Sequence, residues 1–376
     1  MRIVVPKETK VGELRVALVP DIISKLTKAG LEVIIESNAG RSAEYSDKQF
    51  SDAGAQVKSG DVLAGSDVVL SVQPLTATQM KTLKKGAITI SFLSPSTSQD
   101  SIDAAVSASV TAISLEMVPR ISRAQSMDAL TSQALCAGYK ASLVAAELSP
   151  KFFPLLMTAA GTVTPAKVVV LGAGVAGLQA IATAKRLGAV VSAYDVRPAS
   201  ADEVKSMGAK FITLELEALE GAGGYAREMT EERAAKQREL LTPYLAAADV
   251  VITTAAVPGR PAPRLVTGQM VSAMKSGAVI VDLAAETGGN VEGSKPGETI
   301  TTDNGVVIWG GKDVPSQLPY HASMLFSRNV VNLLLLMTKS VDGKPTGDVI
   351  PDFSDEIIDS ATLTHGGSRR TPEGKK

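Results

Sequence analysis

The 376-residue sequence has very little of what several kinds of functional site require. A single cysteine, Cys136, excludes a disulfide within the chain and is typical of a reducing compartment. Two histidines, His321 and His365, are too few for a zinc site with the usual ligands, so we expect no metal. With a net charge of −1 and no basic block before the C-terminal tail, we expect no nucleic-acid partner.

Long apolar runs are also missing. No segment approaches the ~20 apolar residues that a membrane-spanning helix needs, and the longest candidate, Val330–Met337, contains Asn332. The first residues, Met1–Lys7, lead into an expected strand and do not have the form of a signal peptide. Hydrophobic residues still make up 45% of the chain, which is enough for large cores. We therefore expect a soluble, cytoplasmic protein with two domains.

The most informative segment is an apolar run followed by three spaced glycines. Val168–Leu171 is typical of a buried parallel strand, and the glycines then have the spacing of a dinucleotide-binding turn. Gly172 would let the chain reverse, and Gly174 would let the backbone approach a pyrophosphate. Gly177 would let the following helix, 178–187, pack closely on its strand. The free N–H groups of that helix would bind the phosphates.

An acidic residue ends the next expected strand, Val190–Tyr194. The Asp195 carboxylate there can accept hydrogen bonds from a ribose diol and would repel a 2′-phosphate, which predicts NAD(H) rather than NADP(H). Arg197 could hold such a phosphate, but Asp195 comes first at the strand end and carries more weight. The alternative is a tight strand–helix turn without a cofactor.

Apolar runs alternate with helical patterns along the chain, which predicts an α/β protein with doubly wound parallel sheets. The expected strands are residues 3–5, 32–36, 67–72, 87–92, 111–115, 168–171, 190–195, 209–213, 249–254, 278–283 and 306–309. The expected helices include residues 21–29, 98–108, 128–147 and 324–337.

Two Rossmann-like domains joined by long helices would result. The apolar helix near the end of the chain should return to the first domain, which makes that domain discontinuous. We expect residues 1–130 with 320–365 to form it, residues 131–319 to form the NAD(H)-binding domain, and residues 366–376 to be a disordered tail.

A polar loop follows the strand that ends near residue 115. Arg120, Gln125 and Asp128, with Thr131 in the next helical turn, supply the donors and acceptors that a nicotinamide carboxamide needs. The same residues equally suit a solvated loop with an Arg120–Asp128 ion pair and a helix-capping residue.

Two further glycine-containing regions are candidates. Residues 220–229, with Gly224 and Tyr225, suit a lid that closes over a bound cofactor, or a surface loop without a chemical role. The strand ends at 253–259, which include Ala256, and at 282–290 suit the walls of the cofactor site, or ordinary turns after strands.

Acid–base groups are scarce where a dehydrogenase would need them. Oxidation of an alcohol or amine moves a proton as well as a hydride, and histidine usually carries that proton. The first 130 residues contain no histidine, although a lysine base stays possible. Exchange of hydride between two nicotinamide rings needs no proton transfer at the reacting carbons, so the sequence favours that reaction.

These segments resemble the alanine dehydrogenase/transhydrogenase family. The resemblance is carried by Arg15–Pro20, the turn at Gly172, Pro119–Asp128 and Ala159–Thr162, and it is greatest to the NAD(H)-binding component of the transhydrogenase branch. It implies that Arg120, Gln125 and Asp128 orient the nicotinamide, with Thr131 where a serine is familiar. It also implies cofactor contacts at Val175, Asp195, Arg197, Gly224, Tyr225 and Ala256.

Departures from the alanine dehydrogenase branch concern its proton-transferring groups. Where that branch carries a lysine, this chain has Gln73, and where it carries a histidine, this chain has Ser94. The resemblance further implies a homodimer on the cytoplasmic face of the inner membrane. Its partner would be a membrane-embedded transhydrogenase subunit that binds NADP(H) and translocates protons.

The sequence therefore predicts a transhydrogenase subunit that presents NADH for direct hydride transfer to NADP+. The residues expected to act, Arg120, Gln125 and Asp128, would do so by positioning alone. The alternatives are an amino-acid dehydrogenase of the alanine type and a non-enzymatic NAD-binding module.

Overall fold

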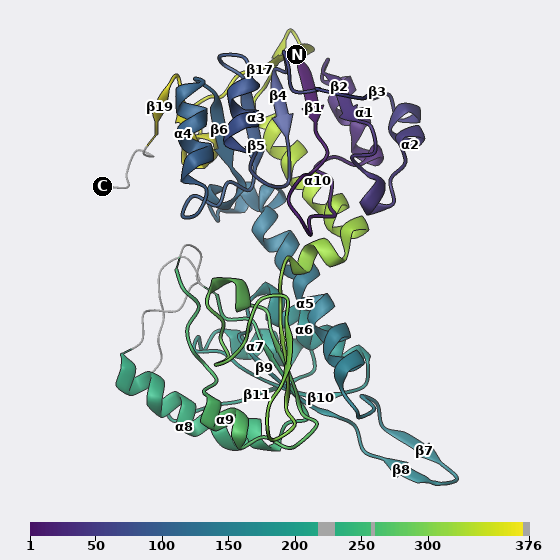
Figure 1. The fold of residues 1–376 in the computed structure, drawn as a ribbon, viewed down its shortest axis with the longest axis vertical. Coiled ribbons are helices and arrows are strands. Elements are labelled where there is room, and N and C mark those ends of the chain that lie inside the picture. Colours follow the sequence, from purple (N-terminus) through teal and green to yellow (C-terminus); the bar gives the residue numbers. More distant parts are fainter. Residues whose placement is uncertain (217–229, 257–259, 371–376) are drawn as a thin grey trace. The chain divides into compact units, whose positions relative to one another are not determined.

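A computed structural model describes residues 1–216, 230–256 and 260–370. The chain forms two compact units, one from residues 1–133 with the chain from residue 315 onward, the other from residues 134–314 (Figure 1). Both are doubly wound α/β units dominated by parallel strands, and the first is discontinuous. The predicted fold class is therefore confirmed. Among the described residues, no helix combines the length and the apolar character needed to span a bilayer.

The sheet of the first unit has the strand order β19-β18-β6-β5-β4-β1-β2-β3. The chain runs from β1 outward to β3, then crosses to β4 on the other side of β1, so that β1 and β4 form the switch point. All neighbours pair in parallel except those made by β18 and β19. The strands are β1 (Arg2–Val5), β2 (Glu32–Glu36), β3 (Gln56–Lys58), β4 (Val68–Leu70), β5 (Ile88–Ser91), β6 (Thr111–Ser114), β18 (Thr362–His365) and β19 (Ser368–Arg369).

Helices from both ends of the chain cover this sheet. The apolar helix α10 (Pro319–Leu336) buries Phe326, Val330 and Leu334 completely in the same core as Ile3 and Ile35. Burial of these side chains removes apolar surface from water, which explains why the C-terminal segment returns to this unit. The other elements are α1 (Pro20–Lys28), α2 (Asp47–Asp52), α3 (Ala77–Thr82), α4 (Gln99–Ser107), the 3₁₀ helix η3 (Ser122–Met127), α11 (Glu356–Ala361) and the hairpin β16 (Thr338–Val341) and β17 (Lys344–Val349).

The sheet of the second unit has the strand order β11-β10-β9-β12-β13-β15-β14. Its switch point lies between β9 and β12, because the chain leaves β9 toward β10 and β11 and then returns to β12. In open α/β sheets, ligands bind at the carboxyl ends of the strands at such a point. The strands are β9 (Lys167–Leu171), β10 (Val190–Tyr194), β11 (Lys210–Phe211), β12 (Val250–Thr253), β13 (Val279–Asp282), β14 (Thr299–Thr301) and β15 (Val307–Gly310).

The long helix α5 (Ala129–Leu148) begins in the first unit and continues into the second. Its small residues allow close approach, because a Cβ on Gly138 would lie 2.0 Å from the carbonyl oxygen of Ala176. The remaining elements of the second unit are α6 (Val175–Arg186), α7 (Ser200–Ser206), α8 (Glu231–Ala247), α9 (Gly268–Ser272) and the hairpin β7 (Leu156–Thr158) and β8 (Gly161–Val163).

The structure corrects part of the predicted tail. Disorder is predicted from residue 366 onward, yet Gly366 and Gly367 turn the chain at positive φ and Ser368–Arg369 pairs with β18 as β19. Arg370 then forms an ion pair with Asp359 and lies over the ring of Phe353. A polar composition hid these contacts, because each partner is distant in the sequence or supplied by the backbone. Residues 371–376 lie outside the described residues.

Candidate functional site

The glycine turn of the second unit follows β9 directly. Gly172 has a φ of +99°, a backbone conformation that residues with a side chain rarely adopt, and a Cβ there would lie 2.6 Å from the Thr254 hydroxyl. A Cβ on Gly177 would lie only 1.9 Å from the Gly172 carbonyl oxygen. Gly174 differs, because a Cβ there would meet no heavy atom of the described residues within 4 Å. The first and third glycines therefore serve internal packing, while Gly174 faces open space.

Helix α6 begins at this turn, and within the described chain no side chain caps its N-terminus. Gly174 occupies the N-cap position, and it has no side chain that could accept a hydrogen bond from the first turn. Val175 is the first helical residue and is 38% exposed. The N–H groups of the first turn and the positive end of the helix dipole can therefore bind an anion.

Asp195 lies at the end of β10 beside the same turn. Its carboxylate accepts hydrogen bonds from the Ala173 N–H at 2.7 Å and from the Arg197 N–H and Nε at 2.9 Å each. Burial alone would raise the pKa of Asp195, but the hydrogen bonds from Arg197 and Ala173 outweigh it and hold the pKa below its usual range. Asp195 is thus a carboxylate at neutral pH, fixed against the backbone of the turn, and Arg197 is its ion-pair partner.

The segment after β12 forms the opposite side of the switch point. The Thr254 hydroxyl donates a hydrogen bond to the Gly172 carbonyl at 3.1 Å, and Ala256, two residues later, is exposed. The structure therefore brings together seven of the predicted cofactor-contacting residues at one edge of the second sheet: Gly172, Gly174, Val175, Gly177, Asp195, Arg197 and Ala256. The predicted lid residues Gly224 and Tyr225 lie outside the described residues.

The polar loop of the first unit surrounds the helix η3. Arg120 and Gln125 are exposed, and Asp128 directly precedes α5. The Asp128 carboxylate accepts hydrogen bonds from the Thr131 N–H at 2.8 Å and from the Thr131 hydroxyl at 2.6 Å, so it caps the start of α5. The helix-capping role that the sequence left open for this loop is therefore present, and Arg120 and Gln125 precede it in the same loop.

Two anchors hold this loop to the C-terminal segment of the chain. Asn329 and Asn332 of α10 each donate a hydrogen bond to the Ser126 carbonyl, at 2.9 and 3.1 Å. Arg123 forms a two-pronged ion pair with Asp355, at 2.7 and 2.9 Å. No local sequence signal marks these contacts, because more than 200 residues separate the partners.

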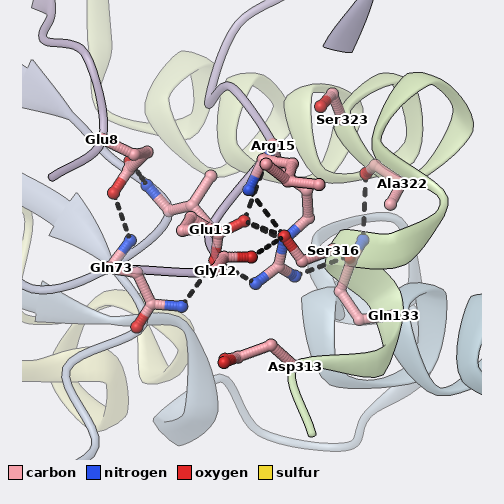
Figure 2. A network of polar contacts seen from close by, with 12 residues as sticks. Glu8, Gly12, Glu13, Arg15, Gln73, Gln133, Asp313, Ser316, Ala322 and Ser323 are labelled. Carbon is pink, nitrogen blue, oxygen red and sulfur yellow. Dashed lines mark hydrogen bonds and ion pairs between the residues drawn. The ribbon is translucent and has the colours of Figure 1, made fainter. Parts of the chain in front are cut away.

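A buried polar network lies behind the carboxyl ends of β1 and β4 (Figure 2). Arg15 donates to both carboxylate oxygens of Glu13, at 2.8 and 2.6 Å, and to Gln133 at 2.8 Å. The Ser316 hydroxyl donates to Glu13 at 3.0 Å. The side chain of Glu13 is fully buried, so this ion pair is shielded from water and strongly dependent on both partners. A charged pair just before the apolar run Val16–Val19 was the available sequence signal.

Gln73 joins this network as a neutral amide. Its side chain donates to Glu13 at 2.7 Å, and Ser94 is bound through its backbone N–H to Glu116 at 2.8 Å. Neither an amide nor a serine hydroxyl accepts a proton readily near neutral pH. The two positions at which we inferred the loss of a lysine and a histidine therefore hold groups unsuited to general acid–base catalysis.

Glu8, beside the network, has a pKa near neutrality. Burial raises the pKa of Glu8 to about 7, although the Val72 N–H, which donates to it at 2.6 Å, lowers it, and the Glu13 charge adds to the rise. Glu8 lines a cavity of about 410 Å³ together with Lys7, Lys10, Ser71 and Thr97. Sequence reasoning missed Glu8, because a lone glutamate after a strand resembles ordinary surface charge.

The histidines lie elsewhere. His365 is on β18, where its Nδ1 lies 2.9 Å from the hydroxyl of Thr111, the first residue of β6. It therefore sits at the amino edge of the sheet, opposite the edge that carries Gln73. His321 is exposed near the start of α10, edge-on to the ring of Tyr320.

Comparisons with known proteins agree with one another. Residues 4–137 match the family described as alanine dehydrogenase/PNT, N-terminal domain, and residues 141–371 match its C-terminal domain. The chain is 46% identical over 378 residues to an NAD(P) transhydrogenase subunit alpha chain of Rhodospirillum rubrum, covering 98% of this chain and 97% of that protein.

Two further likenesses are more distant. The crystal structure of transhydrogenase from Sinorhizobium meliloti superposes with a TM-score of 0.86 at 40% identity, covering 99% of both chains. Alanine dehydrogenase of Mycobacterium tuberculosis is 34% identical over 307 residues, covering 79% of this chain and 76% of that protein.

Proposed function

The chain belongs to the alanine dehydrogenase/PNT family, and within it we propose that the protein is the NAD(H)-binding subunit of a proton-translocating transhydrogenase. Its likeness to transhydrogenase alpha subunits supports the subunit role. In this proposal the chain holds NADH so that hydride passes directly to NADP+ on a membrane-embedded partner, which carries out proton translocation.

The observation that carries the proposal is the glycine turn at the β9–β12 switch point. The uncapped start of α6 and the open space at Gly174 suit a pyrophosphate, with Val175 and Ala256 beside it. Asp195, ionised and fixed beside the turn, suits the adenosine ribose and disfavours a 2′-phosphate. Arg120, Gln125, Asp128 and Thr131 would orient the nicotinamide, and Gly224 and Tyr225 would close over it.

The chemistry proposed for this chain is positioning. NADH supplies the hydride when bound, and the side chains bind the nucleotide, orient its ring and exclude water. Gln73 and Ser94 provide no proton-transferring group, which favours hydride exchange between two nicotinamide rings over oxidation of an amino acid.

The proposed assembly includes a second copy of the chain. The hairpin β7–β8 and the segment leading into it expose Leu155, Met157 and Val163, which are 53%, 80% and 36% exposed. Coverage of these side chains in a homodimer would remove apolar surface from water. The homodimer would lie in the cytoplasm, at the inner membrane, through its transhydrogenase partner.

Titration of the purified chain tests the nucleotide assignment. We expect NADH to quench or enhance nucleotide fluorescence on binding, with NADPH binding at least tenfold more weakly. Addition of membranes that contain the partner subunit should restore reduction of NADP+ by NADH. Equal affinity for the two nucleotides, or no restored activity, would contradict the proposal.

The amino-acid dehydrogenase alternative is decided separately. The likeness to alanine dehydrogenase of Mycobacterium tuberculosis is the observation in its favour. Incubation of the isolated chain with NAD+ and alanine, or with NADH, pyruvate and ammonia, should give no appreciable turnover. Turnover would favour the dehydrogenase, and nucleotide binding without any restored transhydrogenation would favour a non-enzymatic module.

A further inference from the structure

A fully buried asparagine, Asn290, lies on the loop that follows β13. Its Oδ1 accepts a hydrogen bond from the Ala255 N–H at 3.0 Å. Its Nδ2 donates to two carbonyl oxygens, those of Ala255 and Pro263, each at 2.8 Å. Both amide protons and the carbonyl oxygen therefore bind backbone groups, and none of the three faces solvent.

These partners stand at the two ends of one segment. Ala255 precedes residues 256–262 and Pro263 follows them, so a single side chain fixes where this segment begins and ends. Ala256 is the first residue of the segment and a proposed cofactor contact. Thr254, the residue before Ala255, is bonded to Gly172 of the glycine turn. Asn290 is thus connected to both sides of the switch point through the backbone of residues 254–256.

Asn290 is itself held in place by Asp282, which is also fully buried. The Asp282 carboxylate accepts hydrogen bonds from the Asn290 N–H at 3.3 Å, the Val291 N–H at 3.2 Å and the Thr253 hydroxyl at 3.0 Å. Gly289 permits this wrapping, because its φ is +76° and a Cβ there would lie 2.9 Å from Asp282 Oδ2. The loop therefore presents the Asn290 amide from a fixed point.

We propose that Asn290 is a positioning residue of the nucleotide site, which fixes the backbone at Ala255–Ala256 against the glycine turn without contact with the nucleotide. The inference rests on the proposed function, because it concerns the wall of the same NAD(H) site. A side-chain amide suits this role because it combines two donors with an acceptor at nearly the size of a leucine. Its loss leaves three backbone groups without a partner in a buried place.

A matched control exists in the same unit. Asn304 donates through Nδ2 to the carbonyl oxygens of Val271, Ser272 and Met274, at 3.1, 3.3 and 3.4 Å. It precedes β15 and lies at the amino edge of the sheet, away from the glycine turn. Asn304→Ala removes a comparable set of amide–backbone hydrogen bonds and should lower stability without any effect on the nucleotide site.

The test compares Asn290→Ala with Asn304→Ala and the unaltered full-length chain. Hydrogen–deuterium exchange without nucleotide reports on the Ala255 N–H, and NADH titration reports on affinity. We expect Asn290→Ala to speed exchange at Ala255 and to weaken NADH binding, each at least tenfold. Asn304→Ala should leave both within twofold of the unaltered chain, although its thermal unfolding midpoint falls. Asn290→Asp, which keeps the shape and removes both donors, replaces Asn290→Ala if that variant does not fold.

Three results would overturn the inference. These are unchanged exchange at Ala255 in Asn290→Ala, faster exchange with unchanged NADH affinity, and an equal loss of affinity in Asn304→Ala. Failure of the proposed function gives a different result, because the unaltered chain would then bind no NADH. In that event the nucleotide site and its positioning residue both fall, whatever the exchange experiment shows about the loop.

Discussion

At the scale of single residues, ionisable groups of this chain serve two different ends. Asp195 and Glu13 are held charged by hydrogen bonds and arginine partners, so they give the site a fixed negative charge and a fixed backbone. Glu8 has the opposite environment, because burial favours its neutral form. The first two are readable from the sequence as charges near motifs, but the third is not, because it depends on the packing around Val72 and Gln73.

Glu8 makes stability depend on pH in a predictable direction. Its pKa is about 7 in the folded chain and 4.5 as an ordinary side chain, so between these values the folded state holds a proton that the unfolded state has released. The free energy of unfolding therefore falls as pH rises through this window. Glu8→Gln should remove that fall and raise the free energy of unfolding by roughly 1–3 kcal/mol above pH 7, with little difference near pH 4.

Urea unfolding at pH 4, 5.5 and 7.5 checks this for the variant and the unaltered chain. Subtraction of the two curves at each pH cancels the contributions of the other titrating groups. A difference that stays constant with pH would show that Glu8 ionises normally in the folded state.

Asp195→Ala should weaken NADH binding at least tenfold, which corresponds to about 1.4 kcal/mol or more. The variant loses the proposed ribose acceptor and the bond to the Ala173 N–H. Affinity by fluorescence titration, with circular dichroism to confirm the fold, measures the effect. Unchanged affinity would count against the ribose assignment, and a simultaneous gain in NADPH affinity would support it.

At the scale of elements, the β9–α6 unit shows how one glycine pattern divides its roles. Gly177 lets α6 approach the Gly172 carbonyl, while Gly174 leaves room in front of the helix. Gly177→Ala should therefore destabilise the fold by about 3 kcal/mol, since the new Cβ meets backbone that cannot move aside. Gly174→Ala should cost at most about 1 kcal/mol yet weaken NADH binding strongly.

Thermal unfolding and NADH titration of the two alanine variants separate these effects. The two roles require that stability and affinity be lost at different glycines. Equal destabilisation by both substitutions, or normal nucleotide affinity in Gly174→Ala, would contradict the assignment of Gly174 to the pyrophosphate.

The major strands and helices could be predicted because apolar runs and helical periodicity repeat over enough residues. Glu32–Glu36 is a strand with those bounds, and α5 begins and ends one residue later than predicted. The short strands β3, β14 and β19 were missed, because each is only two or three residues long and is stabilised by its neighbour. Helix α10 starts earlier than its apolar pattern, at Pro319, because proline suits the first turn of a helix.

The candidate site was predictable only where local chemistry marks it. The glycine turn and Asp195 follow from spacing along one strand–helix–strand segment. Asn290 did not, since its role depends on Ala255 and Pro263, which lie 35 and 27 residues earlier in the chain. Contacts of this kind are set by the tertiary fold, and a lone asparagine after two glycines is otherwise typical of a turn.

At the scale of the whole molecule, the two units contribute different components of the proposed site. The second unit supplies the glycine turn and Asp195. The first supplies the η3 loop, together with Gln73 and Ser94 in the places where related dehydrogenases were inferred to carry proton-transferring groups. The chain as a whole would therefore hold a reduced nucleotide and leave the acceptor to another subunit.

The fate of an isotope tests this account most directly. NADH deuterated at the transferred position of C4 would be supplied to the chain with partner membranes and NADP+ in ordinary water. Direct transfer between nicotinamide rings predicts that the NADPH formed carries the deuterium in full, with none lost to water. Appearance of the label in water, or NADPH formed without it, would contradict the account.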